Sequence, residues 1–180
     1  MIEKLDNGGP NMQNRKMNLL HTLSHIILTV LIISQIILTF FLYNRAGIEI
    51  IRNIGWIILF MSAIFGWLPI FEFRRKGGVS KGQSFVKTTV FVDSGIYAIV
   101  RHPQFLGGIF LGLALILIAQ NWLVAFIGIP VMIIFYLGIV EGDKYGIEKF
   151  GDVYKRYMEK VPRANFLLGI IRVLRRKVIS

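Results

Sequence analysis

A short segment of the chain, Gly95 to Gly107, contains an arginine, a histidine and a proline in succession, Arg101-His102-Pro103, directly before a long apolar stretch. A charged or titratable group beside hydrocarbon is costly, so such a group indicates a functional site. Arg101 and His102 can both hold an anionic ligand. Pro103 is typical of the first turn of a helix, whose free backbone N–H groups also attract anions.

Acidic residues follow the next apolar stretch, at Glu141-Gly142-Asp143. Together with Arg101 and His102 they would form a pocket suited to a zwitterionic ligand. The ligand carboxylate would meet the arginine and histidine, and its ammonium would meet Glu141 or Asp143. Four aromatic residues are positioned to stack on a flat group or face a cation: Tyr97, Phe105, Tyr145 and Tyr154.

Each of these residues also has a simpler interpretation. Arg101 can be a plain anchor at a membrane surface, and His102 a helix cap. Glu141 and Asp143 can be solvated residues where the chain leaves the membrane, and the aromatic residues can form an interfacial belt. The prediction of a site rests on their coincidence at one membrane face.

Hydropathy predicts an all-α, polytopic membrane bundle. The chain has 180 residues, of which 54% are hydrophobic. Since a spanning helix needs about 20 apolar residues, the uncharged stretches predict four spans. They are about 19–43, 53–72, 103–119 and 122–140. The first is too long for the apolar core of a signal peptide and is expected to be retained.

The net charge of +11 is distributed unevenly. Basic residues are concentrated in the N-terminal segment, in the loop between spans two and three, and in the C-terminal tail, whereas only Arg45 and Arg52 lie on the other side. This positive-inside bias places both termini and the predicted site in the cytoplasm. It favours anionic lipid over nucleic acid as the partner of the basic surface. The absence of cysteine excludes disulfides and thiolate sites, and His21 and His25 lack a third ligand, so no metal site is predicted.

Three regions are expected along the chain: a flexible lead over 1–18, a transmembrane hairpin over 19–73, and a catalytic region over 74–180. The catalytic region begins with a loop whose β-branched stretch, 84–92, predicts an extended strip. After span four, apolar and basic residues alternate at helical spacing. They predict interfacial helices that close the pocket, with a break at Pro162.

The pattern Gly95-x-Tyr97-x-x-x-Arg101-His102-Pro103-x-Phe105-x-Gly107 resembles the isoprenylcysteine carboxyl methyltransferase family, which is itself similar to phospholipid N-methyltransferases. The resemblance continues through two apolar spans, an acidic exit and the tail motif 150–163, and covers about residues 80–165. It implies a membrane-embedded enzyme that uses S-adenosylmethionine. The cofactor-binding residues that it implies are Thr89, Val90, Phe91, Val92, Tyr97, His102, Pro103, Gln104 and Phe105.

Three positions depart from the family pattern. The glutamate pair expected before Phe150-Gly151 is replaced by Gly142 and Asp143, with Glu141 just before, so either Glu141 or Asp143 would bind the cofactor. Phe105 replaces a tyrosine. Gly138 stands where members that methylate a prenylcysteine carboxylate have an arginine, which weighs against a prenylcysteine-like carboxylate without removing it, and leaves lipid amines and small lipophilic thiols or acids open as acceptors.

The function predicted is methyl transfer to a lipophilic acceptor, with Arg101 and His102 as catalytic-site residues that orient the donor. Methyl transfer is an in-line displacement, so it depends on positioning in a dry pocket more than on covalent catalysis. Two alternatives remain open: an NADPH-binding membrane reductase, whose Arg-His-Pro segment is similar, and a non-catalytic scaffold of the same fold. The sequence does not predict the oligomeric state.

Overall fold

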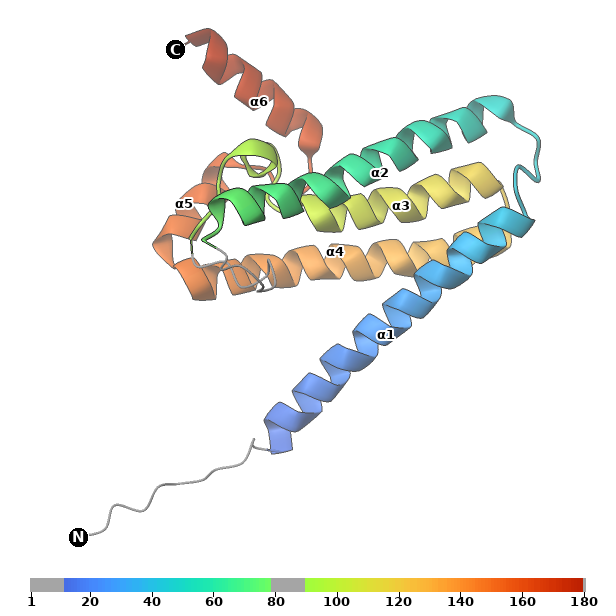
Figure 1. Ribbon diagram of the computed structural model, residues 1–180, viewed down its shortest axis with the longest axis horizontal. Coiled ribbons are helices and arrows are strands. Elements are labelled where there is room, and N and C mark those ends of the chain that lie inside the picture. The colour runs from blue at the N-terminus through green and yellow to red at the C-terminus, as the bar shows by residue number, and fades with distance from the viewer. Residues whose placement is uncertain (1–11, 79–89, 180) are drawn as a thin grey trace.

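The computed structural model describes residues 12–78 and 90–179, and this part of the chain is entirely helical apart from its connections. The expected all-α membrane bundle is confirmed (Figure 1). The elements in chain order are α1 Met12–Phe41, α2 Glu49–Lys76, the short 3₁₀ helix η1 Gly95–Ala98, α3 Pro103–Ala119, α4 Trp122–Phe150, α5 Asp152–Lys160 and α6 Phe166–Ile179.

Three helices, α1, α2 and α4, contain segments long and apolar enough to cross a membrane. The fourth expected span, α3, is an apolar helix of 17 residues, or about 25 Å at 1.5 Å per residue, at the short end of the spanning range. It lies alongside α2 and α4 (Figure 1). Large apolar side chains such as Phe60 and Phe126 are exposed on the outside of the bundle, where a soluble protein rarely exposes so many. The protein is therefore an integral membrane protein.

Helices α2 and α3 pack with their backbones in close approach. A Cβ at Gly107 would lie 3.0 Å from the backbone nitrogen of Gly66 and 3.2 Å from the carbonyl oxygen of Ser62. The Ser62 hydroxyl donates a hydrogen bond of 2.8 Å to the Gly107 carbonyl. Small residues at a helix interface permit such contacts, and they hold the start of α3 against α2.

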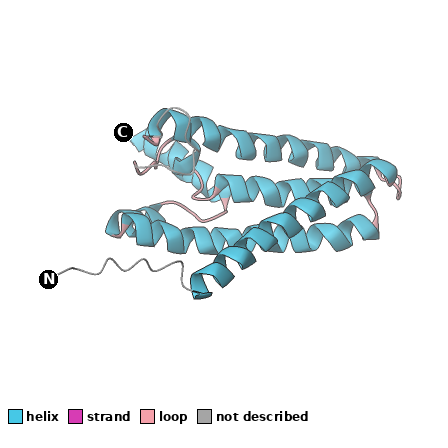
Figure 2. Cartoon of the chain, turned by 60° about the horizontal axis from the view of Figure 1, so that its bottom comes forward, coloured by secondary structure: helices cyan, strands magenta, loops and turns pink. Residues whose placement is uncertain are grey.

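Helix α1 packs on α3 and α4 through its C-terminal half and diverges from the bundle toward its N-terminus (Figures 1 and 2). Gln35 is fully buried, and its amide donates 2.9 Å to the Gly112 carbonyl of α3. The helix begins at Met12, within the stretch 1–18 that was expected to be a flexible lead, and residues 1–11 lie outside the described part.

A single side chain joins the two turns at one end of the bundle. Gln120 lies between α3 and α4 in the left-handed conformation, with φ of 51°. Its amide donates 2.8 Å to Asn44 Oδ1 and 2.8 Å to the Ile48 carbonyl, and its oxygen accepts from the Ile48 N–H at 3.0 Å. The α1–α2 connection is thereby tied to the α3–α4 turn.

Replacing Gln120 with glycine should lower the free energy of unfolding by about 1–3 kcal/mol. Glycine accepts the left-handed conformation, so the loss reports the missing hydrogen bonds rather than strain. Thermal unfolding in detergent would measure it. The neighbouring Asn121→Ala variant removes one capping bond, which the Leu123 N–H donates to Asn121 Oδ1, and should cost less. Equal stability of Gln120→Gly and the unaltered protein would contradict the role of Gln120.

Helix α4 continues beyond the expected span, 122–140, to Phe150, so the span and the helical segment expected after it form one helix. Glu141 and Asp143 therefore lie within a continuous helix. Gly151, with φ of 56°, then reverses the chain so that α5 packs back on α4, and α6 follows at the same end of the bundle. We call this the site end.

Of the expected strip over 84–92, residues 84–89 lie outside the described part, and residues 90–92 form no strand. Val92 is nonetheless buried, in one core with Ile96, Tyr97 and Val100. The strip thus reaches the bundle through its C-terminal end.

Candidate active site

The centre of the site end is the carboxylate of Asp143, which is 3% exposed. Its Oδ1 lies 2.7 Å from His102 Nε2 and 3.4 Å from Arg101 Nη1, and accepts from the Tyr154 hydroxyl at 3.0 Å. Its Oδ2 accepts from Arg163 Nε at 2.7 Å. We call these five residues the Asp143 cluster. It joins α4, the start of α3, α5 and the segment after α5.

Three glycines at four-residue spacing on α4 make room for the rings around this carboxylate. A Cβ at Gly138 would collide with the Phe105 ring, one at Gly142 with the His102 imidazole, and one at Gly146 with the Tyr154 ring. Residues four apart lie on one face of a helix, so the glycines form a groove beside Asp143. The groove explains how two rings reach a carboxylate on a helix.

His102 and Arg101 are held by the turn into α3. Pro103 lies in the first turn, as expected, and His102 occupies the N-cap position without a side-chain capping hydrogen bond. The Arg101 N–H donates 3.1 Å to the Pro162 carbonyl, which ties this turn to the end of α5. Both side chains are buried, Arg101 at 7% and His102 at 9% exposure.

Arg101 has more donors than the described structure satisfies. Its Nε and Nη1 are buried and have no hydrogen-bond partner in the described part of the chain. The Nη1 contact with Asp143 is electrostatic only, because it lacks hydrogen-bond alignment. Buried donors are almost always paired, so these two atoms indicate room for an acceptor that is not part of the protein.

The Asp143 cluster carries a surplus of positive charge. Burial lowers the pKa of His102 below its ordinary value, and the two nearby arginines add to this effect against the pull of Asp143. The lowered pKa favours the neutral imidazole, and the Asp143 carboxylate, which can only accept, pairs with the tautomer that carries its proton on Nε2. Two guanidinium groups then face one carboxylate, so an added anion is favoured.

An aromatic wall closes the cluster on the α5 side. The Phe91 ring centroid lies 6.0 Å from that of Tyr154 and 5.0 Å from that of Tyr157. Tyr157 donates 2.6 Å to the Tyr97 carbonyl. Burial raises the pKa of Tyr154 and of Tyr157, so both phenols are donors rather than bases. This wall connects the 90–98 segment with the Asp143 cluster.

The structure brings only some of the predicted site residues into the Asp143 cluster. Asp143 is inside the cluster, whereas Glu141 is exposed, and so is Tyr145 at 54%. Val90 is 51% exposed, Gln104 is half-buried, and Thr89 lies outside the described part. His102 Nε2 and Asp143 Oδ1 are 2.7 Å apart, so the ligand space that was expected between the imidazole and the acid is closed in this structure.

Arg163 was not predicted as a site residue, although it ends the tail motif Val161-Pro162-Arg163. Sequence spacing gave no reason to bring it to Asp143, because α5 lies between them. The bond becomes possible only because the chain reverses at Gly151.

Filling the α4 groove should disturb the cluster. In Gly142→Ala the new methyl group would lie 2.8 Å from His102 Cε1 and 3.0 Å from Nδ1, so the imidazole must move off Asp143. We expect a loss of about 1–3 kcal/mol in the free energy of unfolding, the scale of overpacking. Thermal unfolding would show it. In the matched control Gly66→Ala the methyl meets nothing within 4 Å, so an equal loss there would contradict the groove interpretation.

A helical membrane bundle with a buried arginine–histidine–aspartate cluster at one end is the arrangement expected of a membrane-embedded methyltransferase. Residues 51–145, more than half of the chain, match the phospholipid methyltransferase family, and the chain belongs to that family. The match contains α3 and most of α2 and α4, and so includes Arg101, His102 and Asp143. It extends further toward the N-terminus than the motifs alone suggested.

The chain is also similar to the protein-S-isoprenylcysteine O-methyltransferase of Schizosaccharomyces pombe, with 29% identity over 114 residues. The similarity covers 58% of this chain and 48% of the relative, so the chain spans about half the length of the curated relative that it matches. No solved structure matches the chain. The predicted resemblance is confirmed, and the reductase alternative is not favoured.

Proposed function

We propose that this protein is an integral membrane methyltransferase that takes its methyl group from S-adenosylmethionine and transfers it to a lipophilic acceptor. The observation that carries the proposal is the buried Arg101, whose Nε and Nη1 have no acceptor in the described part of the chain, within the segment that matches the family.

The residues present fit the donor. Arg101 would hold the carboxylate of the methionine moiety, because its unpaired donors and the surplus positive charge both call for an anion. Asp143 would hold the ammonium group. Arg163, which pairs with Asp143 in this structure, has the most exposed side chain of the cluster, at 40% exposure. The ligand ammonium would therefore displace Arg163 from Asp143 at the lowest energetic cost. His102 keeps Asp143 oriented.

S-adenosylmethionine supplies an electrophilic methyl group on a sulfonium. The protein residues bind, orient and exclude water, which is what an in-line displacement needs. The aromatic wall of Phe91, Tyr154 and Tyr157 offers ring faces to a cation at close range. No described residue of the cluster is assigned as a general base.

The acceptor side of the cluster is apolar. The Phe105 ring covers Gly138, and the Phe135 ring covers Gly108 at the α3–α4 interface. Residues 131–140 of α4 carry no cationic side chain. This disfavours an acceptor carboxylate that is held from α4. It favours a lipid amine, or a lipophilic thiol or acid that is held by another part of the protein. The basic residues at the site end support a cytoplasmic position for the site and both termini.

Incubation of the purified protein and native lipids with methyl-labelled S-adenosylmethionine would test the proposal. Label should appear in a lipid-soluble product, and the protein should bind the donor but not NADPH. The Arg101→Ala variant should lose the labelling, whereas Arg75→Ala, at an exposed arginine near the end of α2, should keep it. Binding of NADPH without S-adenosylmethionine would overturn the assignment, and binding of neither would favour the scaffold.

A further inference from the structure

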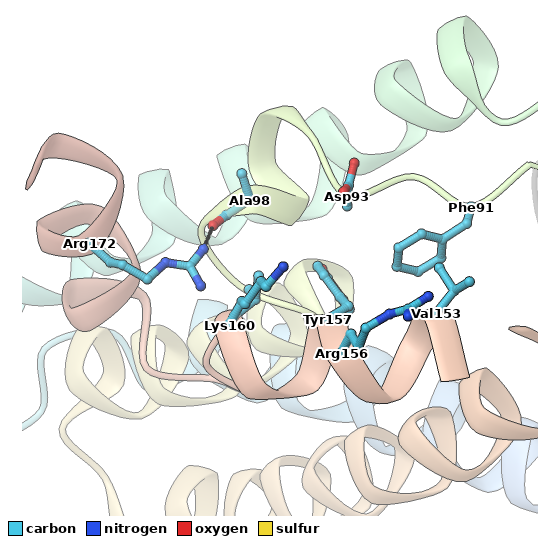
Figure 3. Close-up of a pocket in the computed structure, with 9 residues that line it drawn as sticks. Phe91, Asp93, Ala98, Val153, Arg156, Tyr157, Lys160 and Arg172 are labelled. Atoms are coloured by element: carbon cyan, nitrogen blue, oxygen red, sulfur yellow. Dashed lines mark hydrogen bonds between the residues drawn. The ribbon is translucent and has the colours of Figure 1, made fainter. Parts of the chain in front are cut away.

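A pocket of about 220 Å³ lies at the site end, between the 91–98 segment, α5 and α6 (Figure 3). It is lined by nine residues, among them Phe91, Tyr157 and Val161 on the apolar side. Phe91 and Tyr157 of the aromatic wall line both this pocket and the proposed donor site, whereas the Asp143 cluster does not line the pocket, so the two sites lie on opposite sides of that wall's shared rings and adjoin each other.

Three cationic side chains line this pocket from two helices. Arg156 and Lys160 come from α5 and Arg172 from α6, and Asp93 is the one acid among the lining residues. Arg156 and Lys160 are four residues apart, on one face of α5, where like charges repel each other. Neither has an ion-pair partner within the described ranges. The pocket thus has two positive charges in excess.

The walls that carry these cations are held in place by hydrogen bonds. Arg172 Nη2 donates 2.6 Å to the Ala98 carbonyl, and Gly169 brings α6 against the Ile99 carbonyl, where any Cβ would collide. Tyr157 fixes α5 to the same segment through the Tyr97 carbonyl, at 2.6 Å. A site whose walls are set before binding loses less entropy when a ligand arrives.

We infer that this pocket binds a phosphate group, held between Arg156, Lys160 and Arg172. Arginine matches phosphate through paired N–H donors, and lysine adds a point charge. S-adenosylmethionine does not suit the pocket, because its sulfonium and ammonium groups would face three cations with Asp93 as the one acid among the lining residues. The phosphate can come from a lipid headgroup or from a soluble anion. The exposed apolar residues of α6, such as Leu167, Ile171 and Leu174, place the pocket beside a membrane surface.

The test compares pocket variants with matched variants on the same helices. Lys160→Gln and Arg156→Gln remove exposed pocket cations, and Lys155→Gln removes an exposed α5 lysine outside the pocket. On α6, Arg172→Gln is compared with Arg175→Gln. Titration calorimetry of the full chain in neutral detergent would use inorganic phosphate, a short-chain phosphatidic acid, and a fatty acid of equal chain length as a carboxylate control.

The pocket variants should bind the phosphate ligands about tenfold more weakly than the matched variants, the effect of losing one charge-assisted hydrogen bond. Equal binding of inorganic phosphate and phosphatidic acid would assign the site to a soluble anion, and tighter binding of phosphatidic acid would assign it to a lipid headgroup. Equal losses in pocket and matched variants, equal binding of the fatty acid, or no binding would overturn the inference. Because Lys160 is exposed, its variant stays informative if Arg172→Gln fails to fold.

Discussion

The Asp143→Asn variant should lose about 3–5 kcal/mol of its free energy of unfolding, the largest effect expected in this protein. Asp143 is the carboxylate that two buried or half-buried arginines share. Removing one partner of a buried ion pair leaves uncompensated charge, which costs far more than the pair contributes. Thermal or denaturant unfolding in detergent would measure the loss.

The matched control is Glu141→Gln, which removes the same charge two residues away on the same helix. Glu141 is exposed, so its replacement should change stability by no more than about 0.5 kcal/mol. Equal losses in both variants would contradict the assignment of Asp143 as the centre of the cluster.

A second substitution separates charge balance from general disruption. Adding Arg163→Gln to Asp143→Asn removes one of the two surplus cations, so the double variant should recover part of the lost stability. If the two losses simply add, the coupling between Asp143 and Arg163 is absent, and the cluster does not work as a charge-balanced unit.

The second large effect is expected on donor affinity. Arg101→Ala and His102→Ala should each weaken binding of S-adenosylmethionine by about 1–3 kcal/mol, or roughly 5- to 150-fold in Kd. Arg101 loses its contact with the ligand carboxylate. His102 acts through Asp143, which it orients at 2.7 Å. Binding measured by calorimetry in detergent would give both values.

The conservative variant Arg101→Lys refines this prediction. Lysine keeps the charge but not the paired N–H geometry, so it should restore only part of the affinity. Arg75→Ala serves as the control for general loss of positive charge at this end of the bundle, since Arg75 is exposed on α2. Unchanged affinity in both Arg101→Ala and His102→Ala would contradict the roles proposed for them, whatever the stability of the variants.

Much of the fold follows from local sequence signals. Long uncharged stretches predicted the membrane helices, and Pro103 marked the start of α3, as observed. Span four was expected to leave the membrane near residue 140, with a helix following it. Polar residues can continue a helix beyond the membrane, and α4 does so through Phe150.

The candidate site was predicted in part. Arg101, His102 and an acid were expected together, but Glu141 and Asp143 could not be distinguished by sequence. They are two residues apart, so on a helix they face different directions, and only Asp143 faces α3. Arg163 was missed because its distance to Asp143 depends on the reversal at Gly151.

The sequence by itself determined the membrane class, the starts of α3 and α4 and the residue types at the site, since hydropathy, caps and motifs are properties of neighbouring residues. Only the tertiary structure decided which acid lies beside His102, that Arg163 joins it, and that three cations from α5 and α6 share a pocket. These contacts join residues far apart in the chain. They depend on how the glycines of α4 and the turn at Gly151 let the helices approach, which no local pattern encodes.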